Sequence, residues 1–218
     1  MMHAGKGPHQ NQTVVATGAS IESAPVAMVM VHGRGATAEN ILTLAFELKQ
    51  PDIAYLAPQA AGNSWYPYSF LAPIERNEPG LSSGLAVIAT IMEQVAAAGI
   101  PPERTILLGF SQGACLSLEF AARNAQRYGA VIGLSGGLIG PEGTPRDYPG
   151  SLDGTPVFLG CSDIDPHIPL TRVQESTEIL RGLGGTVTER IYPGMAHIIN
   201  QEEIDCVQQI AHTLLPSS

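Results

Sequence analysis

The sequence has 218 residues, which suits one domain or at most two small ones, and 44% of them are hydrophobic, enough to build a core. Charged residues make up 14% and the formal net charge is -9, with no run of Lys or Arg, so we expect neither a nucleic-acid partner nor stable association with a membrane surface. By our reading, no apolar stretch approaches the ~20 residues of a membrane span.

Short apolar segments rich in β-branched residues alternate with longer helical patterns along the chain. The segments predicted to be strands are residues 24–31, 53–57, 105–108, 130–134, 157–159 and 187–192. The segments predicted to be helices are residues 38–48, 81–98, 112–126, 170–183 and 202–215. This alternation predicts one α/β domain with a parallel sheet covered by helices on both faces. Ligands of such sheets bind beyond the carboxyl ends of the strands, so we expect the functional residues in the loops that follow strands.

The beginning of the chain and its cysteines carry little further information. Residues 1–12 lack the apolar core of a signal peptide and are expected to form a polar, poorly ordered lead-in to a single domain over residues 13–218. The three cysteines, Cys115, Cys161 and Cys206, are odd in number and form no C-x-x-C pair. They are interpreted as reduced structural thiols, which predicts a cytoplasmic protein.

Three Gly-x-Ser-x-Gly segments occur, centred on Ser82, Ser111 and Ser135. A nucleophilic serine on such a turn needs a strand before it and a helix after it. Ser111 alone has both, because residues 105–108 lead in and residues 112–126 lead out. Ser82 follows Pro79 and resembles a helix N-cap, whereas Ser135 is followed by a loop. The sequence therefore predicts Ser111 as the nucleophile.

A serine hydroxyl needs a base to take its proton, and the base needs an orienting acid. On this kind of turn the expected chain order is serine, acid, histidine. His197 lies between the last strand and the last helix and is the candidate base, whereas His212 lies deep in a helix and His167 is expected near the mouth of the site. The acid lies just after another strand, where both Asp163 and Asp165 are available.

The negative oxygen that develops on an attacked carbonyl needs fixed hydrogen-bond donors. One predicted donor is the backbone N–H of Gln112, the residue after the nucleophile, at the start of a helix whose dipole favours negative charge. The other is the backbone N–H of Arg34, in the sequence His32-Gly33-Arg34-Gly35 that follows the first predicted strand. The glycines there allow the backbone to turn its amides inward.

Four segments together resemble the phospholipase/carboxylesterase family of small α/β-hydrolases, which includes bacterial carboxylesterases and acyl-protein thioesterases. They are His32-Gly33-x-Gly35, Gly109-Phe110-Ser111-Gln112-Gly113, Asp165-Pro166-x-Ile168-Pro169 and Gly194-Met195-x-His197. The resemblance runs from about residue 26 to residue 215. It implies an α/β-hydrolase fold and a serine hydrolase of carboxylic esters that uses no cofactor.

The resemblance also bears on the choice of acid. The family's aspartate is followed by two residues and then Val-Pro, a spacing that Asp165 matches with Ile168 and Pro169. The family commonly has a glycine three residues before the acid, and by that measure Gly160 points to Asp163. We give more weight to the downstream spacing and predict Asp165.

A substrate pocket is expected from aromatic and aliphatic residues of two loops that follow strands. Its predicted lining is Trp65, Tyr66, Phe70, Leu71, Leu138 and Ile139. The chain is too short for a large lid domain, which predicts an open site that favours small esters with short acyl chains. Arg34 replaces an apolar residue common in the thioesterases, and a cation at the pocket mouth would disfavour long lipid chains and favour polar or acidic substrates.

The leading hypothesis is therefore a serine carboxylesterase that forms an acyl-enzyme intermediate on a Ser111, His197, Asp165 triad. The alternatives on the same fold are a thioesterase, a lysophospholipase or a dienelactone-hydrolase-like enzyme, and the last of these would normally carry cysteine at position 111. A non-catalytic binding protein would usually lack a triad member. No metal-ligand spacing is recognised. The expected partner is a small-molecule ester, and a homodimer remains compatible with the sequence.

Overall fold

The computed structural model describes residues 7–216 and places seven strands in one sheet, in the order β1-β3-β2-β4-β5-β6-β7. Every neighbouring pair from β3 to β7 is parallel, and β1 pairs antiparallel with β3 at one edge. The strands are β1 (Val14–Gly18), β2 (Val26–Val31), β3 (Ile53–Pro58), β4 (Thr105–Phe110), β5 (Ala130–Leu134), β6 (Pro156–Ser162) and β7 (Thr186–Tyr192). The mostly parallel sheet predicted from the sequence is thereby confirmed.

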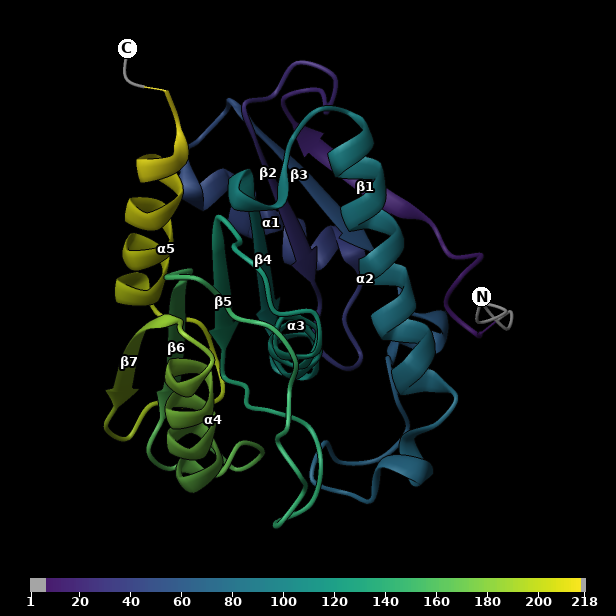
Figure 1. The fold of residues 1–218 in the computed structure, drawn as a ribbon, viewed down its shortest axis with the longest axis vertical. Helices are drawn as coiled ribbons and strands as arrows, with labels where there is room; N and C mark the ends of the chain where they lie inside the picture. Colours follow the sequence, from purple (N-terminus) through teal and green to yellow (C-terminus); the bar gives the residue numbers. More distant parts are fainter. Residues whose placement is uncertain (1–6, 217–218) are drawn as a thin grey trace.

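Helices cover both faces of the sheet (Figure 1). They are α1 (Ala38–Leu48), α2 (Gly80–Ala97), α3 (Gln112–Arg123), α4 (Leu170–Gly182) and α5 (Gln201–Leu214), with short 3₁₀ turns at Ala61–Asn63, Ile74–Asn77 and Pro102–Arg104. Alternate residues of a strand point to opposite faces, so β2 divides its side chains between two cores. Met28 and Met30 belong to the core that α1 and α5 cover, whereas Val29 and Val31 belong to the core that α2, α3 and α4 cover.

Two features of the fold differ from the sequence-based expectations. Strand β1 was not predicted; its side chains alternate between exposed and half-buried, and only its partner β3 holds it in the sheet. The poorly ordered lead-in is wrong for residues 7–12, because this segment forms turns and buries His9, whereas residues 1–6 of the expected lead-in lie outside the described residues. The His9 ring hydrogen-bonds to the Trp65 carbonyl at 2.9 Å and accepts from the Ala61 amide at 3.0 Å.

The expectation that no apolar stretch approaches a membrane span needs correction for helix α2, which is long and apolar enough by length and composition, with a mean hydropathy of 1.3 over its 18 residues. Half of those residues are buried within the fold, where the helix packs on α3 and β2. Packing in the core of the molecule therefore accounts for the apolar composition of α2. The three cysteines, all within the described residues, are free: Cys115 and Cys161 are buried and Cys206 is half-buried.

Candidate active site

The residues predicted to carry chemistry gather at one edge of the sheet. Ser111 follows β4, Asp165 lies beyond β6, His197 lies beyond β7, and Arg34 lies beyond β2. These four strands are parallel, so their carboxyl ends meet at the same edge. Residues that are up to 163 positions apart in sequence therefore reach one site.

Ser111 sits on a strained turn between β4 and α3. Its backbone adopts φ 55° and ψ -118°, a conformation that is unfavourable for a residue with a side chain, and Gln112 begins the helix directly after it. The neighbouring glycines permit this turn by close approach: a Cβ on Gly109 would overlap the Gly113 carbonyl, and one on Gly113 would overlap the Val31 carbonyl. The Ser111 amide donates to the Leu134 carbonyl at 2.9 Å, which fixes the turn to β5.

A hydrogen-bonded chain connects serine, histidine and aspartate. The Ser111 Oγ lies 2.8 Å from the His197 Nε2, and the His197 Nδ1 lies 2.6 Å from the Asp165 Oδ2. The Asp165 side chain is fully buried, and its Oδ1 accepts from the His167 amide at 2.8 Å and the Ile168 amide at 3.0 Å. Burial acts to raise the pKa of Asp165, but the hydrogen bonds from His197 and the two amides outweigh it and lower that pKa.

The structure brings Asp165, and not Asp163, against the histidine. The Asp163 carboxylate instead accepts from the Gly194 amide at 2.8 Å and so braces the loop that leads to His197.

His167 lies near the mouth of the site, as expected, with its ring centroid 4.9 Å from that of His197. His212 is an exposed residue of α5. The His197 ring also packs on the Phe110 ring, with 5.0 Å between the ring centroids.

The other two Gly-x-Ser-x-Gly serines lack such partners. Ser82 lies inside the first turn of α2 and donates to the Glu78 carboxylate at 2.7 Å, so it is not the N-cap that was expected; Pro79 holds that position. Ser135 also has a positive φ of 53°, but its hydroxyl is buried and has no hydrogen-bond partner among residues 7–216.

The two predicted oxyanion donors flank Ser111. Gln112 is the first residue of α3, and Arg34 lies in the loop after β2, where Gly33 packs against Phe110 and Ser111. Within the described chain, neither backbone N–H is paired with a protein acceptor. His32 holds the Arg34 loop: its Nε2 accepts from the Ala60 amide at 3.1 Å, so its Nδ1 carries the proton and donates to the Gly33 carbonyl at 2.8 Å. Burial lowers the pKa of His32, which keeps the ring neutral.

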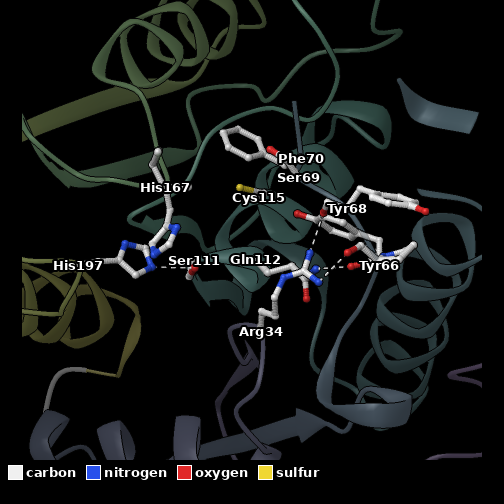
Figure 2. Close-up of a pocket in the computed structure, with 12 residues that line it drawn as sticks. Arg34, Tyr66, Tyr68, Ser69, Phe70, Ser111, Gln112, Cys115, His167 and His197 are labelled. Atoms are coloured by element: carbon white, nitrogen blue, oxygen red, sulfur yellow. Dashed lines mark hydrogen bonds between the residues drawn. The ribbon is translucent and has the colours of Figure 1, made fainter. Parts of the chain in front are cut away.

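A cleft of about 500 Å³ opens over Ser111 (Figure 2). Figure 2 shows His197 and His167 on one side of Ser111 and Arg34, Tyr66, Tyr68 and Phe70 on the other. The lining residues are Arg34, Tyr66, Pro67, Tyr68, Ser69, Phe70, Ser111, Gln112, Cys115, His167, Ile168 and His197.

Of the six predicted pocket residues, only Tyr66 and Phe70 line the cleft. Trp65 is fully buried behind it and donates from Nε1 to the His32 carbonyl at 2.9 Å, which aims the indole into the core. Leu138 and Ile139 are also fully buried, and Leu71 packs half-buried against the core. The prediction of a lining role for these four residues is therefore wrong.

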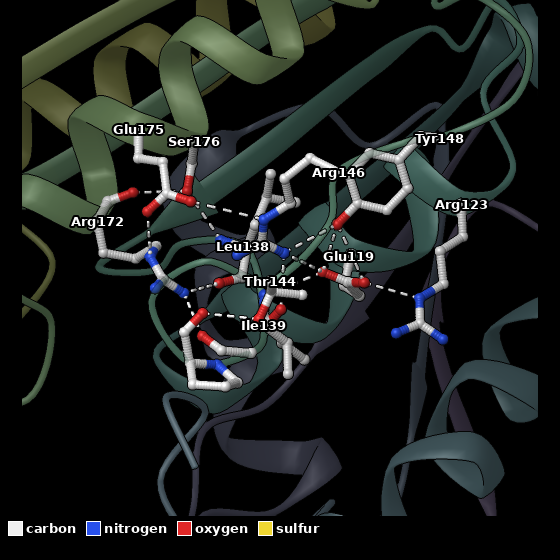
Figure 3. Close-up of polar contacts among 12 residues, drawn as sticks. Glu119, Arg123, Leu138, Ile139, Thr144, Arg146, Tyr148, Arg172, Glu175 and Ser176 are labelled. Atoms are coloured by element: carbon white, nitrogen blue, oxygen red, sulfur yellow. Dashed lines mark hydrogen bonds and ion pairs between the residues drawn. The ribbon is translucent and has the colours of Figure 1, made fainter. Parts of the chain in front are cut away.

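Polar contacts explain why Leu138 and Ile139 face inward (Figure 3). The Leu138 amide donates to the Ser176 Oγ, and the Ile139 amide donates to the carboxylate of Glu119, a buried residue of α3. Arg172 donates to the Leu138 carbonyl at 2.9 Å and so ties the same loop to α4. The amide of Gly140, the residue after Ile139, donates to the Phe70 carbonyl at 2.7 Å. The loop after β5 thus supports the cleft wall from behind.

Several cleft residues were not predicted, among them Tyr68, Ser69, Ile168 and Cys115. Cys115 lies one turn after Ser111 on α3, where burial raises the pKa of its thiol to about 12 and keeps it protonated. The helical spacing of four residues from Ser111 is the one sequence signal that could have placed Cys115 beneath the nucleophile.

Two long side chains hold the loop that forms the cleft wall. The Gln112 side chain accepts from the Trp65 amide and donates to the Tyr66 carbonyl, each at 2.8 Å. The Arg34 guanidinium donates to the Pro67 carbonyl at 3.0 Å and to the Tyr68 carbonyl at 2.7 Å. Each predicted oxyanion residue therefore also positions the wall through its side chain. Over residues 7–216, no group of three or more His, Cys, Asp or Glu side chains could hold a metal ion.

Comparisons with known proteins agree with this geometry. The family model for phospholipase/carboxylesterase matches residues 11–215. A crystal structure of a phospholipase/carboxylesterase from Dyadobacter fermentans is 44% identical, with a TM-score of 0.88, over 94% of this chain and 97% of that one. A crystal structure of esterase PE8 is 25% identical, with a TM-score of 0.76, over 94% of this chain and 99% of that one.

Curated relatives point the same way. Acyl-protein thioesterase 1 of Gibberella zeae is 35% identical over 146 residues, which is 65% of this chain and 62% of the relative. The chain thus spans less than two thirds of that relative's length. Acyl-protein thioesterase 1 of Saccharomyces cerevisiae is 28% identical over 86% of this chain and 92% of the relative. Because the family model covers nearly the whole chain, the protein belongs to the phospholipase/carboxylesterase family of α/β-hydrolases.

Proposed function

We propose that the protein is a serine carboxylesterase that hydrolyses small carboxylic esters with short acyl chains. The observation that carries this proposal is the continuous hydrogen-bonded chain from the Ser111 Oγ through His197 to the buried Asp165, at 2.8 Å and 2.6 Å, on the floor of an accessible cleft. A non-catalytic binding protein would have no need of this chain, or of the strained turn that presents the serine.

In the proposed reaction, the Ser111 Oγ attacks the ester carbonyl while the His197 Nε2 takes its proton. Asp165 accepts the Nδ1 hydrogen, keeps the imidazole in the required tautomer and stabilises the imidazolium that forms. The oxyanion accepts from the backbone amides of Arg34 and Gln112, the latter at the positive end of the α3 dipole. His197 then gives its proton to the alcohol, which leaves. Water, activated by the same histidine, hydrolyses the acyl-enzyme.

The cleft walls support a preference for short acyl chains. Tyr66, Phe70 and Cys115 supply the apolar surface on the Arg34 side of Ser111, but Arg34 and Ser69 lie among them. A long aliphatic chain would have to lie across these polar groups and desolvate them, which costs free energy that a short chain avoids.

A series of activated esters tests the proposal, with acyl groups from acetyl to dodecanoyl, alongside a thioester and a lysophospholipid. We expect the highest kcat/KM between acetyl and hexanoyl. The highest kcat/KM on dodecanoyl or longer esters would contradict the short-chain assignment, and no hydrolysis of any ester would contradict the esterase itself.

A thioesterase is the second candidate, because the curated relatives from Gibberella zeae and Saccharomyces cerevisiae carry that name. The same triad can cleave an oxygen ester and a thioester that carry the same acyl group. A kcat/KM at least about tenfold higher for the thioester than for the matched oxygen ester would favour this second candidate. The dienelactone-hydrolase-like alternative has no support from Ser111, since that chemistry normally uses a cysteine.

A further inference from the structure

The lining of the cleft contains basic residues and no acidic ones, whereas the protein as a whole carries a net negative charge. The chain carries 20 acidic and 11 basic residues, yet no Asp or Glu is among the twelve residues that line the cleft. One arginine and two histidines are among them, namely Arg34, His167 and His197. The nearby Asp165 carboxylate is fully buried behind His197 and is engaged there. A cleft lined by one permanent cation and by no carboxylate attracts an anionic substrate, the more so inside a low-dielectric wall.

Arg34 carries the one permanent positive charge in the cleft lining. Its guanidinium donates to three uncharged oxygens, the Ser64 Oγ and the carbonyls of Pro67 and Tyr68. No carboxylate of the described residues lies within ion-pair distance of it. A guanidinium has five N–H donors, and the contacts with described residues use three of them, which leaves the Nε–H and one Nη2–H for a ligand. Charged N–H donors of a guanidinium form strong hydrogen bonds with a carboxylate.

The three hydrogen bonds hold this guanidinium in one place. They fasten it to the loop that forms the cleft wall, and its Cζ also lies 5.9 Å from the centre of the Tyr66 ring. A second cation contacts the ring of a cleft residue, since the Arg76 Cζ lies 4.2 Å from the centre of the Tyr68 ring. A donor that is already fixed loses little side-chain entropy when a ligand binds, which favours affinity.

The triad fixes which part of an ester meets Arg34. His197 must give its proton to the departing alcohol, so the alcohol lies on the side of His197 and His167. The acyl group then extends to the other side of Ser111, where Figure 2 shows Arg34 with Tyr66, Tyr68 and Phe70. An anionic group within reach of Arg34 therefore belongs to the acyl part of the substrate.

We propose that the preferred substrate is a half-ester of a short dicarboxylic acid, whose free carboxylate binds the Arg34 guanidinium. This inference rests on the proposed esterase function and names its substrate class. Hydrolysis breaks the bond between the acyl carbon and the alcohol oxygen. Water supplies OH to the acyl carbon and H to the alcohol, and the products are a dicarboxylate, an alcohol and one released proton. No other reactant is needed.

The test compares four ethyl esters and one ester of glycolate, which differ in the presence and position of a free carboxylate. Monoethyl glutarate and monoethyl adipate carry the carboxylate on the acyl side, diethyl adipate and ethyl butanoate are neutral, and butanoyloxyacetate carries the carboxylate on the alcohol side. We expect kcat/KM for the better half-ester to exceed that of both neutral esters by about tenfold to a hundredfold. This is the usual contribution of a hydrogen bond that involves a charged group. Raising the salt from 20 to 500 mM should reduce this ratio.

Arg34→Met provides the direct control, because it keeps the backbone amide and most of the side-chain length. It removes the charge together with the three hydrogen bonds to the wall, and the neutral esters measure any effect of the lost wall contacts. We expect the ratio of half-ester to neutral-ester kcat/KM to fall at least about tenfold. Arg104→Met also removes a positive charge, but just before β4, at the opposite end of that strand from Ser111. This variant should leave the ratio unchanged.

Three results would overturn the inference. One is hydrolysis of neutral esters with no preference for either half-ester. Another is a half-ester preference that persists in Arg34→Met. The third is a preference for butanoyloxyacetate that depends on Arg34, which would place the anion on the alcohol side. A failure to hydrolyse every ester in the set would instead contradict the esterase function itself, so the two proposals fail in different ways.

Discussion

At the scale of single residues, the assignment of the acid rests on which carboxylate meets the histidine. Asp165 and Asp163 are two positions apart on one loop, yet only Asp165 contacts His197, whereas Asp163 accepts from the Gly194 amide. Sequence spacing alone gave two different answers here. The direction of each side chain depends on the hydrogen bonds of the folded loop, and these are not visible in the sequence.

We expect Asp165→Asn to reduce kcat at least about a hundredfold, because the amide no longer holds the required tautomer or stabilises the imidazolium; the same change in a well-studied protease cost about 10⁴. Asp163→Asn should reduce kcat less than about tenfold. Ester hydrolysis under saturating substrate measures both. Thermal melting of each variant checks that the fold is kept. An inactive Asp163→Asn variant with an unchanged melting temperature would reverse the assignment.

The cleft residues show where prediction from the sequence stops. The candidate triad and oxyanion residues follow from turns at the ends of strands, which the strand and helix pattern locates. The prediction was wrong for Trp65, because its indole N–H bonds the His32 carbonyl and turns the ring into the core. It was wrong for Ile139 because its amide bonds the buried Glu119. Aromatic or aliphatic character identifies a residue as apolar but does not say which cavity it faces.

At the scale of elements, helix α5 begins directly after the loop that carries His197, and its first turn contains a buried carboxyl. Glu203 and Asn200 form a reciprocal cap: the Glu203 amide donates to the Asn200 Oδ1 and the Asn200 amide donates to the Glu203 Oε2, each at 2.9 Å. The Glu203 side chain is fully buried, and burial raises its pKa from 4.5 to about 7.

This raised pKa predicts a dependence of stability on pH. The folded state binds the Glu203 proton more tightly than the unfolded state, so the stabilisation is complete below pH 4.5 and is lost as the pH rises through about 7. We expect wild type to lose up to about 3 kcal/mol relative to Glu203→Gln between pH 4.5 and 8, since the amide does not ionise. Urea unfolding at several pH values measures the difference.

The neighbouring Glu202 provides the matched control for this experiment. It is exposed on the same turn of α5, and Glu202→Gln should retain the pH dependence of wild type. If Glu203→Gln instead follows the wild-type curve, the Glu203 carboxyl is not the group that titrates.

At the scale of the whole molecule, the alternation of apolar strands and helices was sufficient to predict a mostly parallel sheet with helices on both faces. It could not reveal β1, because Val14–Gly18 is short and half-exposed, and its one strand partner is β3, whose residues are distant in sequence. The segment before β1 was also misjudged. Polar composition suggested disorder, whereas His9 gains its order from partners more than 50 positions away.

His9 connects the start of the described chain to the wall of the cleft. His9→Ala would leave the Trp65 carbonyl and the Ala61 amide without their partner, and we expect a loss of about 2 kcal/mol or more in the free energy of unfolding. The exposed His212→Ala should change it by less than about 0.5 kcal/mol. Chemical denaturation compares the two, and equal effects would mean that the His9 contacts contribute nothing to stability.

The central claim is that Ser111, and neither Ser82 nor Ser135, is the nucleophile. Reaction with a fluorophosphonate, followed by peptide mapping with mass spectrometry, tests it most directly, because the reagent is attacked only by an activated serine. We expect the label on Ser111 in wild type and in the Ser82→Ala and Ser135→Ala variants, and neither label nor ester hydrolysis in Ser111→Ala. Label on Ser135, or hydrolysis that persists in Ser111→Ala, would contradict the account.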